Sequence, residues 1–111
     1  MVCGVSVHHS RANGALMAFA VVLKFLGGTL EQYDLLIAKM GFQPGEAGAR
    51  HSLFHWAAAT DHGIQLTDVW ESRRALEQFA AEQIGPLAGE VGLPGPPEIT
   101  FYEVHSYLTA R

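Results

Sequence analysis

The sequence predicts an α+β domain whose elements follow the order β-α-β-β-α-β. Three features lead to this prediction: a β-hairpin signal in the middle of the chain, two capped segments with apolar residues at helical spacing, and an alternating segment near the C-terminus. The chain has 111 residues, of which 49% are hydrophobic and 16% are charged. This length and composition are typical of one small globular domain.

The first strand is predicted over residues 15–25, where almost every residue is apolar. A strand that is apolar on both faces belongs in the centre of a sheet. Gly27-Gly28 ends it. Residues 1–14 show no period and are predicted to form a flexible tail, so the single predicted domain spans residues 15–111.

A helix is predicted directly after this strand. Thr29 is a favourable N-cap, and Gln32 completes a capping-box pattern three residues later. Gly41 ends the helix, and the Pro- and Gly-containing residues 42–50 form a loop. The buried face of the helix is expected to carry Leu30, Tyr33, Leu36, Ile37 and Met40.

The hairpin is the strongest local signal in the chain. Residues 61–63, Asp-His-Gly, have turn chemistry and lie between two apolar runs. If residues 62 and 63 form the loop, paired residue numbers sum to 125, and His55 lies opposite Trp70 and diagonal to Asp68. These three side chains then share one face of the sheet. The two strands are expected over residues 51–60 and 64–71.

The second half of the chain is predicted to add one helix and one strand. Ser72 caps the helix, and Gly85-Pro86 is expected to kink it. Its buried stripe is expected to contain Leu76, Phe79, Ala80, Ile84 and Leu87. Residues 98–107 alternate and form the last strand. With right-handed crossovers, this order gives a ferredoxin-like βαββαβ fold, a four-stranded antiparallel sheet with both helices on one face.

Such a fold leaves one sheet face uncovered, and here neither face of the hairpin is simply polar. One face is predicted to carry Phe54, Trp56 and Val69, and the other Leu53, Leu66 and Trp70. A monomer cannot bury both faces. The expected remedy is a homodimer through the sheet faces.

Composition excludes several classes of partner. The net charge is −4, and the 7 basic residues are not clustered, which argues against nucleic acid. The apolar run from residue 15 is too short to span a bilayer, so no membrane partner is predicted. A signal peptide is the alternative for this run, although Lys24 interrupts it. Cys3 is the sole cysteine, which rules out an internal disulfide and fits a cytoplasmic location.

The segments LFHW, TDHGI, TDVWES and PGPPEITFYEVHSYL, together with Phe79, resemble the dimeric α/β-barrel superfamily. More narrowly, they resemble small stand-alone proteins of its antibiotic-biosynthesis-monooxygenase-like branch, over residues 17–109. The resemblance implies a dimeric barrel. It also implies a cofactor-independent monooxygenase, or a related acid/base enzyme, that acts on a small aromatic or polyketide-like molecule. Haem degradation fits poorly, because the resembling enzymes use an axial histidine from the second helix and residues 71–90 contain none.

The predicted catalytic residues are His55, Asp68 and His105. Asp68 would accept a hydrogen bond from one imidazole nitrogen of His55 and so make the other nitrogen a base. His105 would be a second acid/base group. The alternative is that Asp68 caps a nearby backbone group, while His55 is a satisfied polar residue at a cavity edge.

Trp70, Phe79 and Tyr107 are predicted to bind the substrate. The alternatives are that the tryptophan is core or interface packing, and that the polar residues of the last strand protect a sheet edge. No cofactor or metal is predicted: no Gly-rich phosphate loop follows the first strand, and His51 and His55 would lie roughly 13 Å apart along one strand. The alternative function is a non-catalytic homodimer that binds a small apolar or aromatic ligand, or a purely structural dimer.

Overall fold

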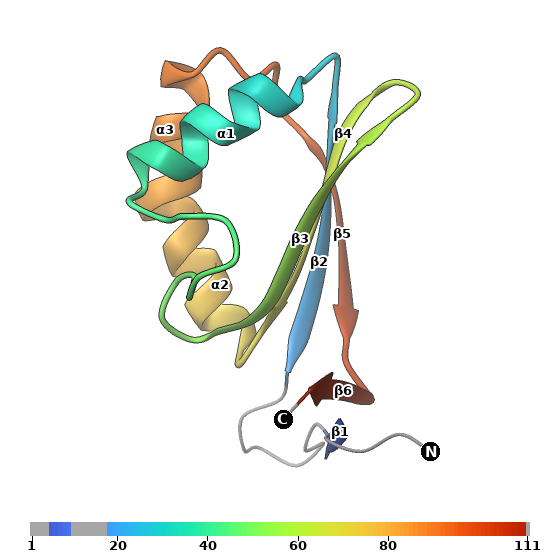
Figure 1. Ribbon diagram of the computed structural model, residues 1–111. Coiled ribbons are helices and arrows are strands. Elements are labelled where there is room, and N and C mark those ends of the chain that lie inside the picture. The colour runs from blue at the N-terminus through green and yellow to red at the C-terminus, as the bar shows by residue number, and fades with distance from the viewer. Residues whose placement is uncertain (1–4, 10–17, 111) are drawn as a thin grey trace.

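The computed structural model describes residues 5–9 and 18–110. A helical layer covers one side of a four-stranded sheet, and a separate two-stranded sheet lies at one end (Figure 1). The strands are β1 (Val5–His9), β2 (Phe19–Leu26), β3 (Ser52–Thr60), β4 (Gly63–Trp70), β5 (Glu98–Glu103) and β6 (Ser106–Ala110). The helices are α1 (Leu30–Lys39), α2 (Arg73–Phe79), the π-helix η1 (Ala80–Ile84) and α3 (Gly85–Glu90).

The four-stranded sheet has the strand order β3-β4-β2-β5, and every neighbouring pair is antiparallel. Figure 1 shows α1, α2 and α3 on the same side of this sheet, and no described helix covers its other face. The predicted α+β class and the four-stranded antiparallel sheet are confirmed. The arrangement is compatible with a ferredoxin-like fold.

The core lies between the sheet and the helical layer. On β2 and β4, every second residue is buried, as expected for strands with one face toward the core. The apolar core consists of Val21, Leu23 and Phe25 of β2, Ile64, Leu66 and Trp70 of β4, Leu36 and Leu76 of the helices, and Leu93. The opposite face of β2 includes the exposed Lys24, so this central strand is less completely buried than its sequence indicates.

The starts of both long helical segments follow their predicted caps. The Thr29 hydroxyl accepts a hydrogen bond from the backbone N–H of Gln32 at 3.1 Å, and the Gln32 side chain accepts one from the Thr29 N–H at 3.0 Å. The Ser72 hydroxyl accepts from the Ala75 N–H at 3.2 Å. Each cap satisfies N–H groups that the first helical turn leaves unpaired.

The predicted hairpin register is wrong by two residues. The loop consists of Asp61-His62, Thr60 pairs with Gly63, and His55 lies directly opposite Asp68. The reason lies outside the hairpin, because Gly63 is a strand residue packed against the end of β2. A Cβ at Gly63 would overlap the carbonyl oxygen of Phe25, so the glycine serves a close backbone approach and not a turn.

The second helical segment consists of α2, η1 and α3, and it contains a π-helix just before Gly85-Pro86, where a kink was predicted. The backbone N–H of Gly85 bonds to the carbonyl of Ala80, five residues earlier. Pro86 has no N–H to donate to the preceding turn, so the α-helical ladder cannot pass through it unchanged. One wider turn absorbs this defect. In the predicted stripe only Leu76 is buried, and Phe79, Ala80, Ile84 and Leu87 are half-buried.

The C-terminal segment forms two strands where one was predicted. β5 ends at Glu103, and β6 pairs with β1 in the separate sheet. Of the predicted tail over residues 1–14, the structure describes residues 5–9, which form β1; the others lie outside the described residues. In the described part of the chain, no helix has the length and apolarity that crossing a membrane requires.

Candidate functional site

Three polar side chains form a hydrogen-bonded chain between α1 and the hairpin. Asp68 is 6% exposed and is the one buried polar or charged residue among those described. Its carboxylate bonds to Nδ1 of His55 on the neighbouring strand. Nε2 of His55 lies 2.6 Å from the hydroxyl of Tyr33 on α1, and the two rings stack with centroids 5.8 Å apart. We refer to Tyr33, His55 and Asp68 as the polar triad.

Burial raises the pKa of Tyr33 above its ordinary value, and the negative charges of Asp68 and Asp34 raise it further, so the hydroxyl keeps its proton. The direction of the hydrogen bonds follows from Asp68, because a carboxylate only accepts and Nδ1–H of His55 must donate to it. In the neutral imidazole, Nε2 then accepts from the Tyr33 hydroxyl. Both imidazole nitrogens have protein partners, so a substrate that uses His55 as a base must first displace Tyr33.

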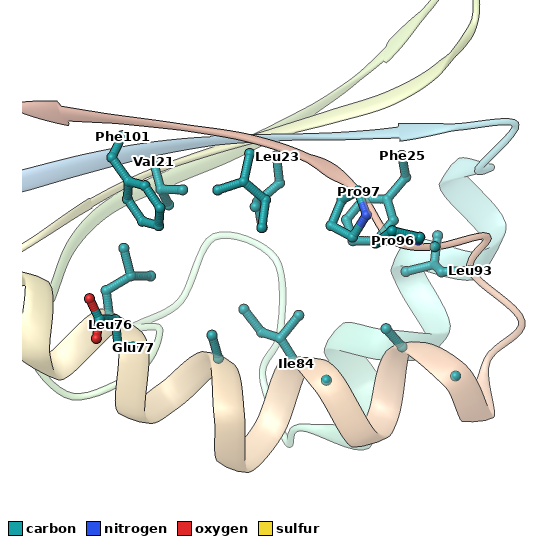
Figure 2. A pocket seen from close by; sticks show the side chains of 16 residues that line it. Val21, Leu23, Phe25, Leu76, Glu77, Ile84, Leu93, Pro96, Pro97 and Phe101 are labelled. Atoms are coloured by element: carbon teal, nitrogen blue, oxygen red, sulfur yellow. The ribbon is translucent and has the colours of Figure 1, made fainter.

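A cavity lies apart from the polar triad, between β2, β5 and the second helical segment. Figure 2 shows this cavity, which has a volume of about 500 Å³. Apart from Glu77, all of its 16 lining residues are apolar or glycine. They are Val21, Leu23, Phe25, Leu76, Glu77, Ala80, Ile84, Gly85, Ala88, Gly89, Leu93, Gly95, Pro96, Pro97, Ile99 and Phe101. We refer to this opening as the apolar cavity. None of the polar triad lines it.

The apolar cavity exists because small residues lie where a helix normally presents large ones. Ala80, Gly85, Ala88 and Gly89 all line it from the helical side. A Cβ at Gly89 would meet no atom within 4 Å, and one at Gly85 would meet only the Ala80 carbonyl oxygen, at 3.4 Å. Ile99 and Phe101 of β5, which line the cavity from the side of the sheet, therefore stay 51% and 38% exposed.

A second, more polar cavity of about 440 Å³ lies next to the hairpin. Trp70 and Phe79, both predicted to bind substrate, line it with ring centroids 5.0 Å apart. Trp70 is 2% exposed, and its indole N–H has no hydrogen-bond partner among the described residues. The structure therefore brings these two aromatic residues together at the second cavity, which is separate from the apolar cavity.

The two remaining predicted site residues lie near the C-terminus. His105 occupies the bend between β5 and β6, and Tyr107 lies on β6 opposite His8 of β1. Neither residue lines either cavity. In Figure 1, β6 lies beside β1 at one end of the molecule, below the four-stranded sheet.

Sequence reasoning missed Tyr33 as a polar site residue. The sequence prediction includes it in the apolar stripe of the first helix, and its ring does face the sheet, where it stacks on His55. A usable signal was present: a hydroxyl within that stripe faces the hairpin, where His55 and Asp68 needed polar partners.

Comparisons of this chain with protein-family models, with curated proteins and with solved structures find no match. Within residues 5–9 and 18–110, no group of three or more His, Cys, Asp or Glu residues is arranged to hold a metal ion.

Proposed function

We propose that the protein binds a small apolar molecule in the apolar cavity and acts as a homodimer. The single observation that carries the proposal is the cavity itself, with its volume of about 500 Å³ and its almost wholly apolar lining. Small-molecule sites in proteins are mostly apolar and measure roughly 300–1,000 Å³. Because the polar triad lies outside this lining, the geometry supports ligand binding more directly than turnover.

The homodimer is supported by the sheet face that the helices leave bare. Phe54, Trp56 and Tyr102 are 58%, 42% and 55% exposed. In the sheet register they lie on the face opposite to the buried Val21 and Asp68. Three exposed aromatic side chains on one face favour coverage by another protein surface. A second copy of the same face would form the dimeric α/β barrel that the sequence resembles.

Cavity filling tests the binding proposal. We expect Ala88→Phe to weaken binding of the neutral fluorescent probe 1-aminoanthracene more than about tenfold, because the new ring occupies the cavity. Ala81→Phe is the matched control, since Ala81 is exposed on the same helical segment and lines neither cavity. An Ala88→Phe variant that binds the probe as tightly as the unchanged protein contradicts the proposal, as does a wild-type protein that does not bind it.

Light scattering tests the homodimer. Trp56→Asp places a charge on the bare face, and we expect this variant to be monomeric at a micromolar concentration at which the unchanged chain is dimeric. Leu35→Asp is the control, because Leu35 is 51% exposed on α1, away from that face. Dimers that persist in Trp56→Asp, or an unchanged chain that is monomeric, would argue against this interface.

The second candidate function is an acid/base enzyme, in particular a cofactor-independent monooxygenase acting on a small aromatic molecule. The bond between His55 and Asp68 favours it, because a carboxylate that orients a histidine is a common element of general-base catalysis. In this case the substrate anion would itself supply the electron to dioxygen. Oxygen uptake with anthrone-like phenols tests the idea. His55→Ala should abolish uptake, whereas His62→Ala in the exposed hairpin loop should not.

A further inference from the structure

One end of the apolar cavity carries its single polar side chain. Figure 2 places Glu77 and Phe101 at this end, and Leu93 and Pro96 at the other. The Glu77 side chain is 58% exposed, so this end opens to solvent. A ligand whose apolar body fills the cavity would therefore present its own polar end at Glu77.

Arg73 holds the Glu77 carboxylate in place. Its Nε donates to Oε1 of Glu77 at 2.6 Å, one helical turn away. The guanidinium carbon of Arg73 lies 4.6 Å from the ring centroid of Phe101 and 5.7 Å from that of Phe19, distances typical of cation–π contacts. Arg73 thus contacts both rings and pairs with Glu77 at the exposed end of the cavity. The second carboxylate oxygen, Oε2, makes no hydrogen bond within the described part of the chain.

The charges around Oε2 restrict the chemistry of a ligand. A free carboxylate oxygen accepts hydrogen bonds, so the matching ligand group is a donor. An anionic ligand would face two negative charges, those of Glu77 and of Glu103, against the one positive charge of Arg73; Glu103 lies opposite Phe19 on the same side of the sheet. A cationic ligand would approach Arg73, whose charge already balances that of Glu77. A neutral hydroxyl donates without either penalty.

We infer that Glu77 is the specificity-determining residue of the apolar cavity, and that it selects neutral apolar alcohols over hydrocarbons and over carboxylates. This inference rests on the proposed ligand binding. The hydroxyl of the ligand donates to Oε2 at the open end, while the hydrocarbon body lies between the sheet and the helical segment. Because this end is solvent-exposed, water competes for Oε2 and the selection is moderate.

Displacement of 1-aminoanthracene by three ligands with the same ring system tests the inference. The ligands are naphthalene, 2-naphthalenemethanol and 2-naphthoate. We expect the alcohol to bind about three- to tenfold more tightly than naphthalene. A hydrogen bond to a charged group contributes only modestly to affinity where water competes for the same oxygen. The carboxylate should bind most weakly. Glu77→Met should remove the preference for the alcohol, whereas Glu90→Met, at an exposed position that lines neither cavity, should retain it.

The outcomes separate this inference from the proposed function. If naphthalene and the alcohol displace the probe equally well, or if Glu77→Met retains the preference, the selection by Glu77 is wrong while ligand binding stands. If neither the probe nor any of the three ligands binds, the proposed function fails and the selection fails with it. Circular dichroism and the melting temperature of Glu77→Met establish that the variant is folded.

Discussion

On the side of the sheet that faces the helices, the half formed by β3 and β4 differs from the half formed by β2 and β5 in how its side chains pack. Over β3 and β4, polar and aromatic side chains contact one another: Tyr33 bonds His55, His55 bonds Asp68, and Trp70 packs on Phe79. Over β2 and β5, large aliphatic side chains face small ones and leave the apolar cavity. The His55–Asp68 pair thus lies in the half where side chains contact one another and the neighbouring cavity is the more polar one, whereas the apolar space for a ligand lies in the other half.

The largest change in stability is expected when the polar triad in the first half is broken. His55→Ala leaves the buried Asp68 carboxylate without its partner, and we expect the free energy of unfolding to fall by about 2–3 kcal/mol. Denaturation in urea measures this. His62→Ala is the matched control in the exposed loop and should change the stability by less than about 0.5 kcal/mol. Equal values for the two variants would mean that Asp68 does not depend on His55.

A smaller change in stability, of opposite sign, is expected for a substitution at the apolar cavity. Gly89→Ala adds a Cβ that meets no atom within 4 Å and improves helix propensity, so we expect the protein to become more stable by about 0.5–1 kcal/mol. Thermal denaturation measures the change. Gly28→Ala is the contrasting variant, because a Cβ there would lie 3.0 Å from that of Phe25, in the packed core. It should destabilise, and a Gly89→Ala variant that also destabilises would mean that the helix face is not open.

The smallest effect concerns alkaline pH. Because burial and nearby carboxylates raise the pKa of Tyr33 in the folded protein, an unfolded chain releases this proton at a lower pH than the folded one. The stabilisation from the protonated hydroxyl is complete below pH 10.0, the ordinary value, and is lost as the pH rises toward the folded value. Tyr33→Phe should therefore flatten the decline in stability above that pH. An identical decline in both proteins, measured by urea denaturation across this range, would contradict the assignment.

Local signals in the sequence were sufficient for much of the fold. Thr29 with Gln32, and Ser72, predict where the two helical segments begin, because a cap depends on residues within one turn of each other. The hairpin register could not be predicted in the same way. It depends on the approach of Gly63 to Phe25, residues that are far apart in the sequence.

The candidate site was harder to predict than the fold. The contact between His55 and Asp68 followed from alternation, since both side chains share a face in either register. The apolar cavity did not follow, because glycine and alanine in a helix give no sign of whether they face solvent or an empty space. Sequence reasoning placed Ala80 and Ile84 in a buried stripe, whereas both line an opening.

The π-helix makes the helical segment one residue longer than a continuous α-helix over the same path. The wide turn absorbs this extra residue locally, so the residues that follow keep the directions they would have in a continuous α-helix. Without it, the same extra residue would rotate everything that follows by about 100° and carry Ala88 and Gly89 away from the apolar cavity. The space for a guest molecule therefore depends on the hydrogen-bond pattern of one helical turn as well as on the small side chains beyond it.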